Sequence, residues 1–181
     1  MVSLTFFFFI MVVLFGLVGA ARGWAKEMLV TFGVVLSLFL LALLEQYVPI
    51  VVNLVRSTEP GLMRSLFWMR FVIIVLLSYF GYQTPYLPRI SGQRFAREKL
   101  QDTLLGFILG SLNAYFIVGS IWFYMHQAGY PFQYISAPVE GTPMGDAAIR
   151  LLAWMAPEWL TIPYVYFAVA VAFVFVIVVF L

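Results

Sequence analysis

Five long apolar segments, separated by short polar stretches, dominate the pattern of the chain. They cover residues 2–21, 28–44, 65–82, 104–125 and 162–181. A helix needs about 20 largely apolar residues to cross the hydrocarbon core of a bilayer, and these segments approach or reach that length. The pattern therefore predicts an all-α, polytopic integral membrane protein with about five transmembrane helices in one domain, residues 1–181. The second helix can continue to Val55 with a bend at Pro49.

The polar stretch after the fourth segment predicts one further helix of another kind. Thr142 can cap it, and Pro143 stands where a helix tolerates proline best. Apolar residues then fall on one face, whereas Asp146 and Arg150 fall on the other. We expect an amphipathic helix over about 143–156 that lies along the outer membrane surface or on the other helices.

Composition narrows the class of protein further. Hydrophobic residues make up 64% of the chain and charged residues 10%, whereas soluble domains are about half apolar and a quarter charged. The chain has no cysteine and a single histidine, His126, so it cannot form a multi-histidine or thiolate metal site alone. A net charge of +2 is too small for a nucleic-acid-binding protein. We expect membrane lipids as ligands and no required cofactor.

The distribution of basic residues predicts the orientation. Loops on the cytoplasmic side of membrane proteins carry the excess of lysine and arginine. The first and third loops contain six such residues, Arg22, Lys26, Arg89, Arg94, Arg97 and Lys99, and the second and fourth loops contain three or four. We therefore place the N-terminus outside and the C-terminus in the cytoplasm. We expect the first segment to be retained rather than cleaved, because its positive charges follow it.

The first loop contains a candidate site, Arg22-Gly23-x-x-x-Glu27. We interpret it as a tight cytoplasmic turn, in which Gly23 permits the reversal and Glu27 lies in the first turn of the next helix, where a negative charge is favourable. The alternative is a docking site for a partner protein or an anionic lipid headgroup.

The fourth segment contains a strip of small residues. Gly106, Gly110 and Ala114 are four residues apart and so lie on one helix face. Such a strip lets another helix approach closely, either from the same chain or from a partner protein. Packing within the chain is the interpretation we favour.

Polar side chains in or near the apolar segments are the other candidates. Asn113 needs a hydrogen-bond partner in hydrocarbon, so it either bonds to a neighbouring helix or lines a polar path. Asp102 is expected to cap the start of the fourth span. Arg70 is expected to extend to the membrane interface. His126 is a candidate ligand for haem or a pigment, although a solvated histidine explains it better.

Two of these stretches resemble the colicin V production protein (CvpA) family of bacterial inner-membrane proteins. The first is the Arg-Gly-x-x-x-Glu turn, here Arg22, Gly23 and Glu27. The second is the family pattern Asp-Arg-x-x-Gly-x-x-x-Gly-x-x-Arg-Gly. In that pattern Asp102, Gly106 and Gly110 match, and Thr103, Asn113 and Ala114 replace Arg, Arg and Gly. The resemblance covers roughly the first four spans and the outer helix.

The resemblance implies a bacterial inner-membrane protein linked to colicin export and envelope homeostasis, with no enzymatic activity. This chain lacks two motif arginines and adds a fifth apolar segment. We therefore expect a non-catalytic, CvpA-like scaffold or accessory protein that acts through helix–helix contacts. A narrower version makes it an accessory subunit of a larger photosynthetic or respiratory complex, with other membrane proteins as partners. The alternative is a small transporter or channel component whose path Asn113 and Arg70 line.

Overall fold

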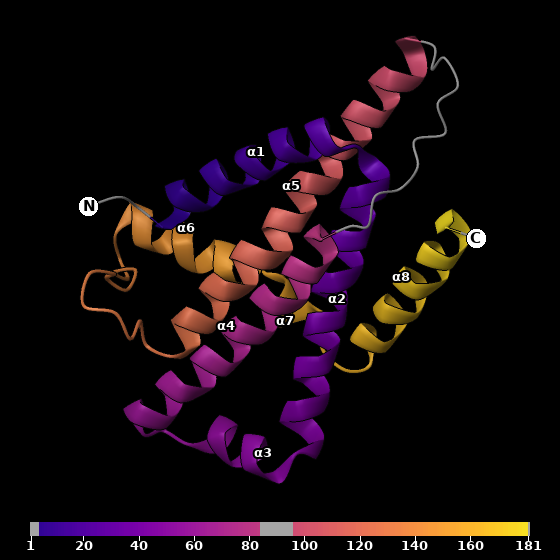
Figure 1. Cartoon of the computed structure of the whole chain (residues 1–181). Coiled ribbons are helices and arrows are strands. Elements are labelled where there is room, and N and C mark those ends of the chain that lie inside the picture. The colour runs from indigo at the N-terminus through magenta and orange to yellow at the C-terminus, as the bar shows by residue number, and fades with distance from the viewer. Residues whose placement is uncertain (1–3, 84–95, 181) are drawn as a thin grey trace.

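The computed structural model describes residues 4–83 and 96–180. This part of the chain contains only helices and no strand, which confirms the all-α prediction (Figure 1). The helices are α1 Leu4–Arg22, α2 Trp24–Tyr47, α3 Pro49–Arg56, α4 Pro60–Tyr82, α5 Ala96–Gln127, α6 Pro143–Leu152, α7 Ala156–Trp159 and α8 Tyr164–Phe180. Residues 84–95 of the predicted polar loop at 84–101, with Arg89 and Arg94, lie outside the described residues, as do residues 1–3 and 181. The rest of that predicted loop, with Arg97 and Lys99, is helical and belongs to α5.

Four of these helices, α1, α2, α4 and α5, are long and apolar enough to cross a membrane. They agree with four of the five predicted spans, and the chain is a membrane protein. The fifth apolar helix, α8, has 17 residues and a length of about 26 Å at 1.5 Å per residue, so it is shorter than the other four.

Several helix boundaries differ from the predicted ones. Gly23 alone separates α1 from α2, so the predicted six-residue turn is too long. Its φ of 87° is a conformation that residues with a side chain rarely adopt. The second span does not continue to Val55, because α2 ends at Tyr47 and Pro49 begins the separate helix α3. Figure 1 shows α3 lying across the ends of α2 and α4.

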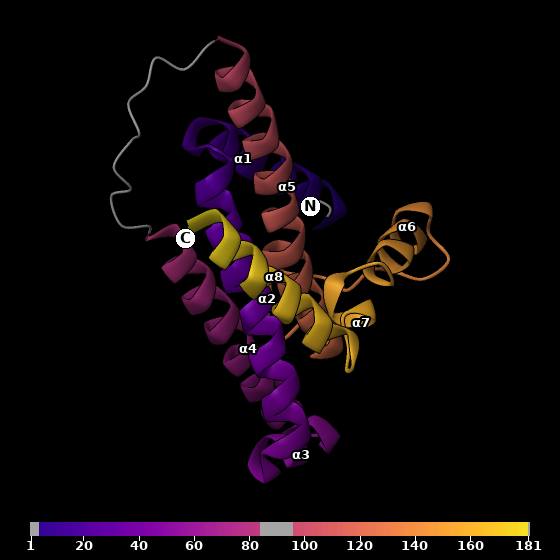
Figure 2. The same cartoon turned by 90° about the vertical axis from the view of Figure 1, so that its right-hand side faces the viewer.

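Helix α2 is the centre of the bundle. It packs against α4, α5 and α8, while α1 packs mainly along α5 (Figure 2). The contact with α8 includes two pairs of aromatic rings, Phe32 with Phe173 and Phe39 with Tyr166, whose centroids are 5.9 and 5.8 Å apart. Val30, Val34 and Leu41 on α2 are among the side chains fully or almost fully enclosed by these neighbours.

The predicted small-residue strip on α5 is a contact surface within the chain. A Cβ atom on Gly106 would collide with the backbone carbonyl oxygen of Gly19 on α1, and one on Gly110 would collide with that of Phe15. Ala114, the third residue of the strip, is fully buried. The two backbones therefore approach as closely as small residues permit, and Gly106 and Gly110 lie against α1 of the same chain.

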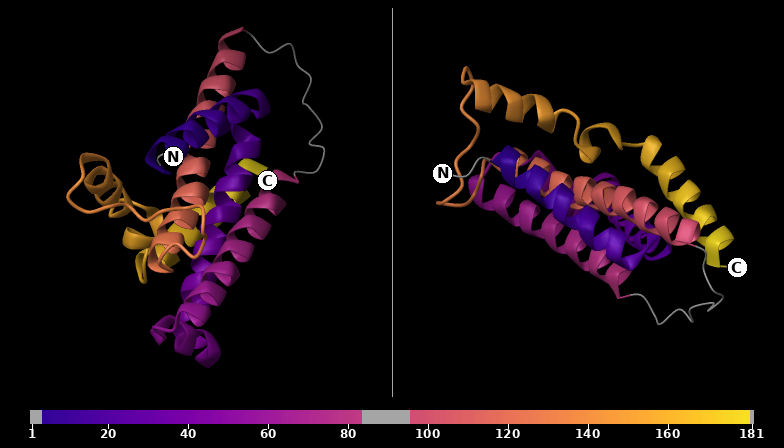
Figure 3. Two further views of the ribbon diagram at one scale, coloured as in Figure 1. Left: turned by 90° about the vertical axis from the view of Figure 1, so that its left-hand side faces the viewer. Right: turned by 90° about the horizontal axis from the view of Figure 1, so that it is seen from above.

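The predicted outer amphipathic helix exists but is shorter and broken. The Thr142 hydroxyl accepts a hydrogen bond from the Gly145 N–H at 3.1 Å, as a helix cap does. Helix α6 ends at Leu152, and the short helix α7 follows after a turn. Met144, an apolar residue in the first turn of α6, is 69% exposed, because α6 buries Ala148 and Leu152 instead. In Figure 3, α6, α7 and α8 form a layer along one side of the other helices.

Candidate functional site

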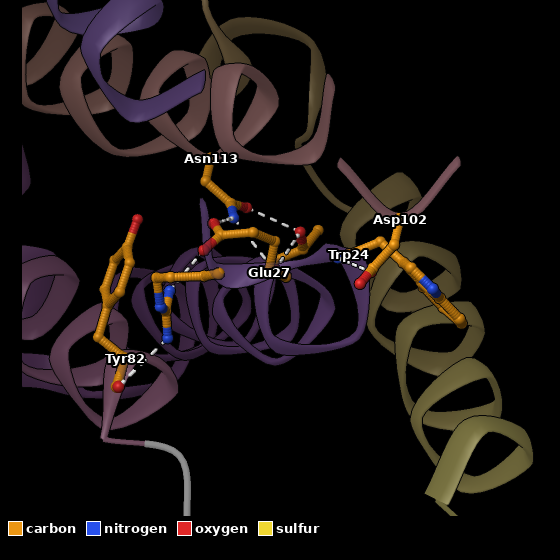
Figure 4. Close-up of polar contacts among 7 residues, drawn as sticks. Trp24, Glu27, Tyr82, Asp102 and Asn113 are labelled. Atoms are coloured by element: carbon orange, nitrogen blue, oxygen red, sulfur yellow. Dashed lines mark hydrogen bonds and ion pairs between the residues drawn. The ribbon is translucent and has the colours of Figure 1, made fainter. Parts of the chain in front are cut away.

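A buried carboxylate, Glu27, is the centre of the candidate site (Figure 4). Its side chain is fully enclosed, although it lies only in the first turn of α2. One carboxylate oxygen forms an ion pair with the Arg22 guanidinium at 2.5 Å. The other accepts a hydrogen bond from the Asn113 amide at 2.9 Å. Both carboxylate oxygens are thus engaged, as a charge removed from water requires.

Further contacts tie this cluster to α4 and α5. The Arg22 guanidinium donates to the Tyr82 carbonyl at 3.3 Å and lies 4.4 Å from the centre of the Tyr82 ring. Asn113 donates to the Glu27 carbonyl at 3.1 Å and accepts from the Thr31 hydroxyl at 2.7 Å. We call Arg22, Glu27, Thr31, Tyr82 and Asn113 the Glu27 cluster. It joins the ends of α1, α2 and α4 to the middle of α5.

Asp102 does not cap its own helix, which corrects the prediction. Helix α5 begins at Ala96, so Asp102 lies within it. Its carboxylate instead accepts a hydrogen bond from the backbone N–H of Trp24, the first residue of α2, at 3.1 Å. A Cβ atom on Gly23 would stand 2.8 Å from that same oxygen. Asp102 therefore caps α2 from a neighbouring helix, and Gly23 provides the space for it.

Replacement of Asp102 by alanine is expected to destabilise the protein by about 1 kcal/mol, because the first N–H groups of α2 lose a side-chain acceptor. Asp102→Asn keeps an oxygen acceptor at that position and should lose less. The free energy of unfolding in bicelles would measure both. Equal losses for the two variants would show that the charge, rather than the cap, is what matters.

A second cluster surrounds Arg70, which corrects the expectation that this side chain extends to the membrane interface. Arg70 is only 5% exposed. Its guanidinium donates to the Glu45 carboxylate at 2.7 Å and to the Gln127 side-chain oxygen at 2.8 Å, and it lies 4.4 Å from the centre of the Tyr124 ring. We call Arg70, Glu45, Tyr124 and Gln127 the Arg70 cluster. It joins α2, α4 and α5 at the opposite end of α2.

The two clusters share four kinds of side chain. Each contains one arginine, one glutamate of α2, one amide side chain of α5 and one tyrosine ring against the guanidinium. Planar guanidinium groups suit such sites, because they accept a ring on one face while donating in their own plane. These contacts bind α2 to α4 and α5 near both of its ends.

Removal of the arginine in the second cluster, Arg70→Ala, is expected to destabilise the protein by about 2 kcal/mol. This is less than the 3–5 kcal/mol for breaking a fully buried pair, because the Glu45 side chain left behind is 23% exposed and can be hydrated. Arg70→Lys should recover only part of the loss, because an ammonium cannot reproduce the planar contacts. Thermal unfolding in detergent would rank the three proteins.

The structure separates two residues that the transporter alternative placed on one path. Asn113 belongs to the Glu27 cluster and Arg70 to the other, and each is occupied by hydrogen bonds. Asn113 forms three hydrogen bonds to Glu27 and Thr31 of α2, rather than one interhelical hydrogen bond. His126 lies exposed in the last turn of α5 with its ring 5.7 Å from that of Tyr130. Among the described residues, no group of three or more His, Asp or Glu side chains forms a metal site.

The contacts and charges near the first turn do not favour the alternative of an anionic lipid headgroup bound there. Arg22, which would bind it, is engaged by Glu27 and by Tyr82. A shallow pocket of about 330 Å³ beside the turn is lined by Trp24, Glu98, Gln101, Asp102 and Leu105. Its two carboxylates would repel a phosphate rather than attract one.

Comparison with protein-family models, with curated proteins and with solved structures finds no match to this chain. Its function therefore has to be inferred from the residues and their geometry.

Proposed function

We propose that the protein is a non-catalytic scaffold or accessory protein of a bacterial inner membrane that acts through helix–helix contacts. The observation that carries this proposal is a contrast between the interior of the molecule, which contains paired charges, and its outer faces, which are apolar. Inside, Arg22 is paired with Glu27 and Arg70 with Glu45, one pair in each cluster. Outside, α1 and α4 present apolar side chains that are more than half exposed, namely Phe6, Phe9, Val13, Leu17, Val72, Tyr79 and Phe80.

The CvpA-like character of the chain is part of the proposal. Two separate stretches carry that resemblance, and the structure brings them together in space. Gly23 of the first stretch lies against Asp102 of the second. Gly106 of the second stretch packs on α1 just before Arg22. Residues that act as one structural unit provide a physical reason for the two stretches to occur together. The orientation we propose keeps the N-terminus outside and the C-terminus in the cytoplasm.

The narrower form of the proposal is an accessory subunit of a larger photosynthetic or respiratory complex, with lipid as its only expected ligand. The exposed aromatic side chains of α1 and α4 support this form, because aromatic residues are enriched at protein interfaces. They also suit lipid contact, so the distinction requires an experiment.

Extraction of native membranes with a mild detergent, followed by a native gel, tests the proposal. We expect a discrete large band that contains this chain together with other membrane proteins at constant ratios. A band that contains the 20.6-kDa chain alone would contradict the accessory-subunit form. Expression of the Gly106→Val variant in the same strain serves as a control, because a chain with a disrupted fold should be lost from the large band.

A second candidate function is a small transporter or channel component. The observation that favours it is the fully buried polar pair of Glu27 and Asn113, because ionisable residues inside spans often mark ion pathways. Ion flux in liposomes that disappears on Asn113→Leu would support this candidate.

A further inference from the structure

The apolar part of α5, residues 104–125, provides the reference for depth in the membrane. It belongs to a helix that is long and apolar enough to cross a bilayer. Its 22 residues correspond to about 33 Å at 1.5 Å per residue, which is close to the hydrocarbon thickness of about 30 Å. Side chains in contact with the middle of this part of α5 therefore lie within the membrane.

The segment 153–163, which connects α6 to α8, is in contact with this part of α5. The Tyr115 hydroxyl on α5 donates to the Trp154 carbonyl and accepts from the Trp159 indole N–H, the latter at 3.0 Å. Tyr115 is 12 residues from Gln127 of the Arg70 cluster, or about 18 Å along α5. The sulfur of Met155 would be 2.6 Å from a Cβ atom on Gly119, eight residues from Gln127.

The start of α8 gives an independent indication that this part of the chain lies within the membrane. The Tyr166 ring packs on that of Phe39. Phe39 is six residues, or about 9 Å, from Glu45 of the Arg70 cluster. Helix α8 therefore begins inside the membrane, which explains why 17 residues are sufficient for it. Figure 3 shows α6, α7 and α8 following one another along one side of the other helices, so we infer that the chain crosses the remaining depth of the membrane as α8.

The outward face of this segment is poorly suited to lipid. Glu158 is exposed on α7, and its side chain has no hydrogen bond or ion pair within the described residues. Trp154 is 74% exposed, and the non-helical residues Thr161 and Pro163 are exposed as well. Irregular backbone and carboxylates occur at membrane depth only where protein or water covers them.

From these observations we propose that residues 153–163 form a docking surface for a membrane-embedded segment of another protein, which brings a cationic side chain to Glu158. The inference rests on the proposed function, since it identifies where an accessory subunit meets its complex. A large exposed indole beside a charged group is a typical anchor of a protein interface. A cationic partner would neutralise Glu158 without leaving either charge uncovered.

The absence of cysteine makes the depth directly measurable. A nitroxide attached to Trp154→Cys in nanodiscs that hold the purified full chain should be more accessible to oxygen than to a water-soluble nickel chelate. Val72→Cys, 52% exposed on α4, is the reference for a residue within the membrane, and Tyr134→Cys, 93% exposed in the loop, is the reference for water. If residue 154 behaves like residue 134, the segment lies outside the membrane and the inference fails.

The partner is tested on the native particle. Reaction of Trp154→Cys and Glu158→Cys with N-ethylmaleimide should be at least ten-fold slower in the particle than in the isolated chain, with Tyr134→Cys unchanged. Unchanged rates at 154 and 158 in an intact particle would overturn the docking surface but leave the accessory-subunit proposal standing. Protection that also appears in nanodiscs containing two copies of the chain alone would assign the surface to a second copy and overturn the inference.

The charge of the partner has its own test. Glu158→Arg should reduce the yield of the native particle at least ten-fold, while Glu140→Arg, an equally exposed change in the preceding loop, should leave it unchanged. The thermal stability of the isolated chain should not change in either variant. A particle that tolerates Glu158→Arg would rule out a cationic group at this position.

Discussion

Glu27→Ala is expected to destabilise the protein by about 3–5 kcal/mol. The substitution removes the carboxylate that neutralises Arg22 and leaves a guanidinium largely enclosed by protein without its counter-charge. It also removes one acceptor of Asn113, a residue with no access to water. The measurement is the free energy of unfolding in bicelles, obtained for example by steric trapping.

A matched control is Glu59→Ala. Glu59 is also a glutamate next to the start of a helix, but its side chain is exposed and caps nothing in α4. Its replacement should change the stability by less than about 0.5 kcal/mol, as for most surface substitutions. Similar losses for the two variants would show that burial of Glu27 is not what makes it important.

Gly106→Val is the second substitution with a large expected effect. The new side chain would collide with the backbone of Gly19, so α1 would have to move away from α5. Because backbone cannot yield as a flexible side chain does, the loss should be about 3 kcal/mol or more. Displacement of α1 would also separate Arg22 from Glu27. The free energy of unfolding in bicelles would measure this loss.

The control for this substitution is Gly61→Ala. A Cβ atom on Gly61 meets no other atom within 4 Å, so the variant should be as stable as the natural chain or slightly more stable. If Gly106→Val were tolerated equally well, the close contact between α1 and α5 would not exist in the protein.

The apolar segments predicted the helices well, because a bilayer selects long apolar helices irrespective of their partners. The boundaries were less predictable. Helix α5 begins at Ala96 rather than at Leu104, since the intervening polar residues include good helix formers that extend the helix beyond its apolar part. Pro49 was interpreted as a bend, but it begins a new helix, as proline in a first turn commonly does.

The candidate site was predicted only in part. Arg22, Gly23, Glu27, Asp102 and Asn113 were all singled out, but as a turn, a cap and a separate amide. Their assembly into neighbouring contacts depends on the crossing of α2 with α5, which no local pattern encodes. One feature of the sequence could have revealed it. Arg22 and Glu27 stand on opposite sides of Gly23, and each is next to an apolar segment.

The Arg70 cluster was missed for a similar reason. Glu45 and Gln127 stand at the ends of apolar segments, where polar residues are normally hydrated. Their positions in the sequence therefore did not indicate a buried contact. Only the antiparallel packing of α2 against α4 brings Glu45 to Arg70. The depth of residues 153–163 was equally hidden, because an amphipathic pattern is the same for a helix on the surface and for one that packs within the membrane.

A double-mutant cycle on Arg22 and Glu27 tests most directly the central claim that the charges inside the spans hold the helices together. The account predicts that Arg22→Ala and Glu27→Ala each destabilise strongly, and that the double variant is no less stable than the less stable of the two single variants. This corresponds to a coupling energy of about 2 kcal/mol or more between the two side chains. If the two losses simply add, the pair does not act as a structural unit, and the scaffold account of this site is contradicted.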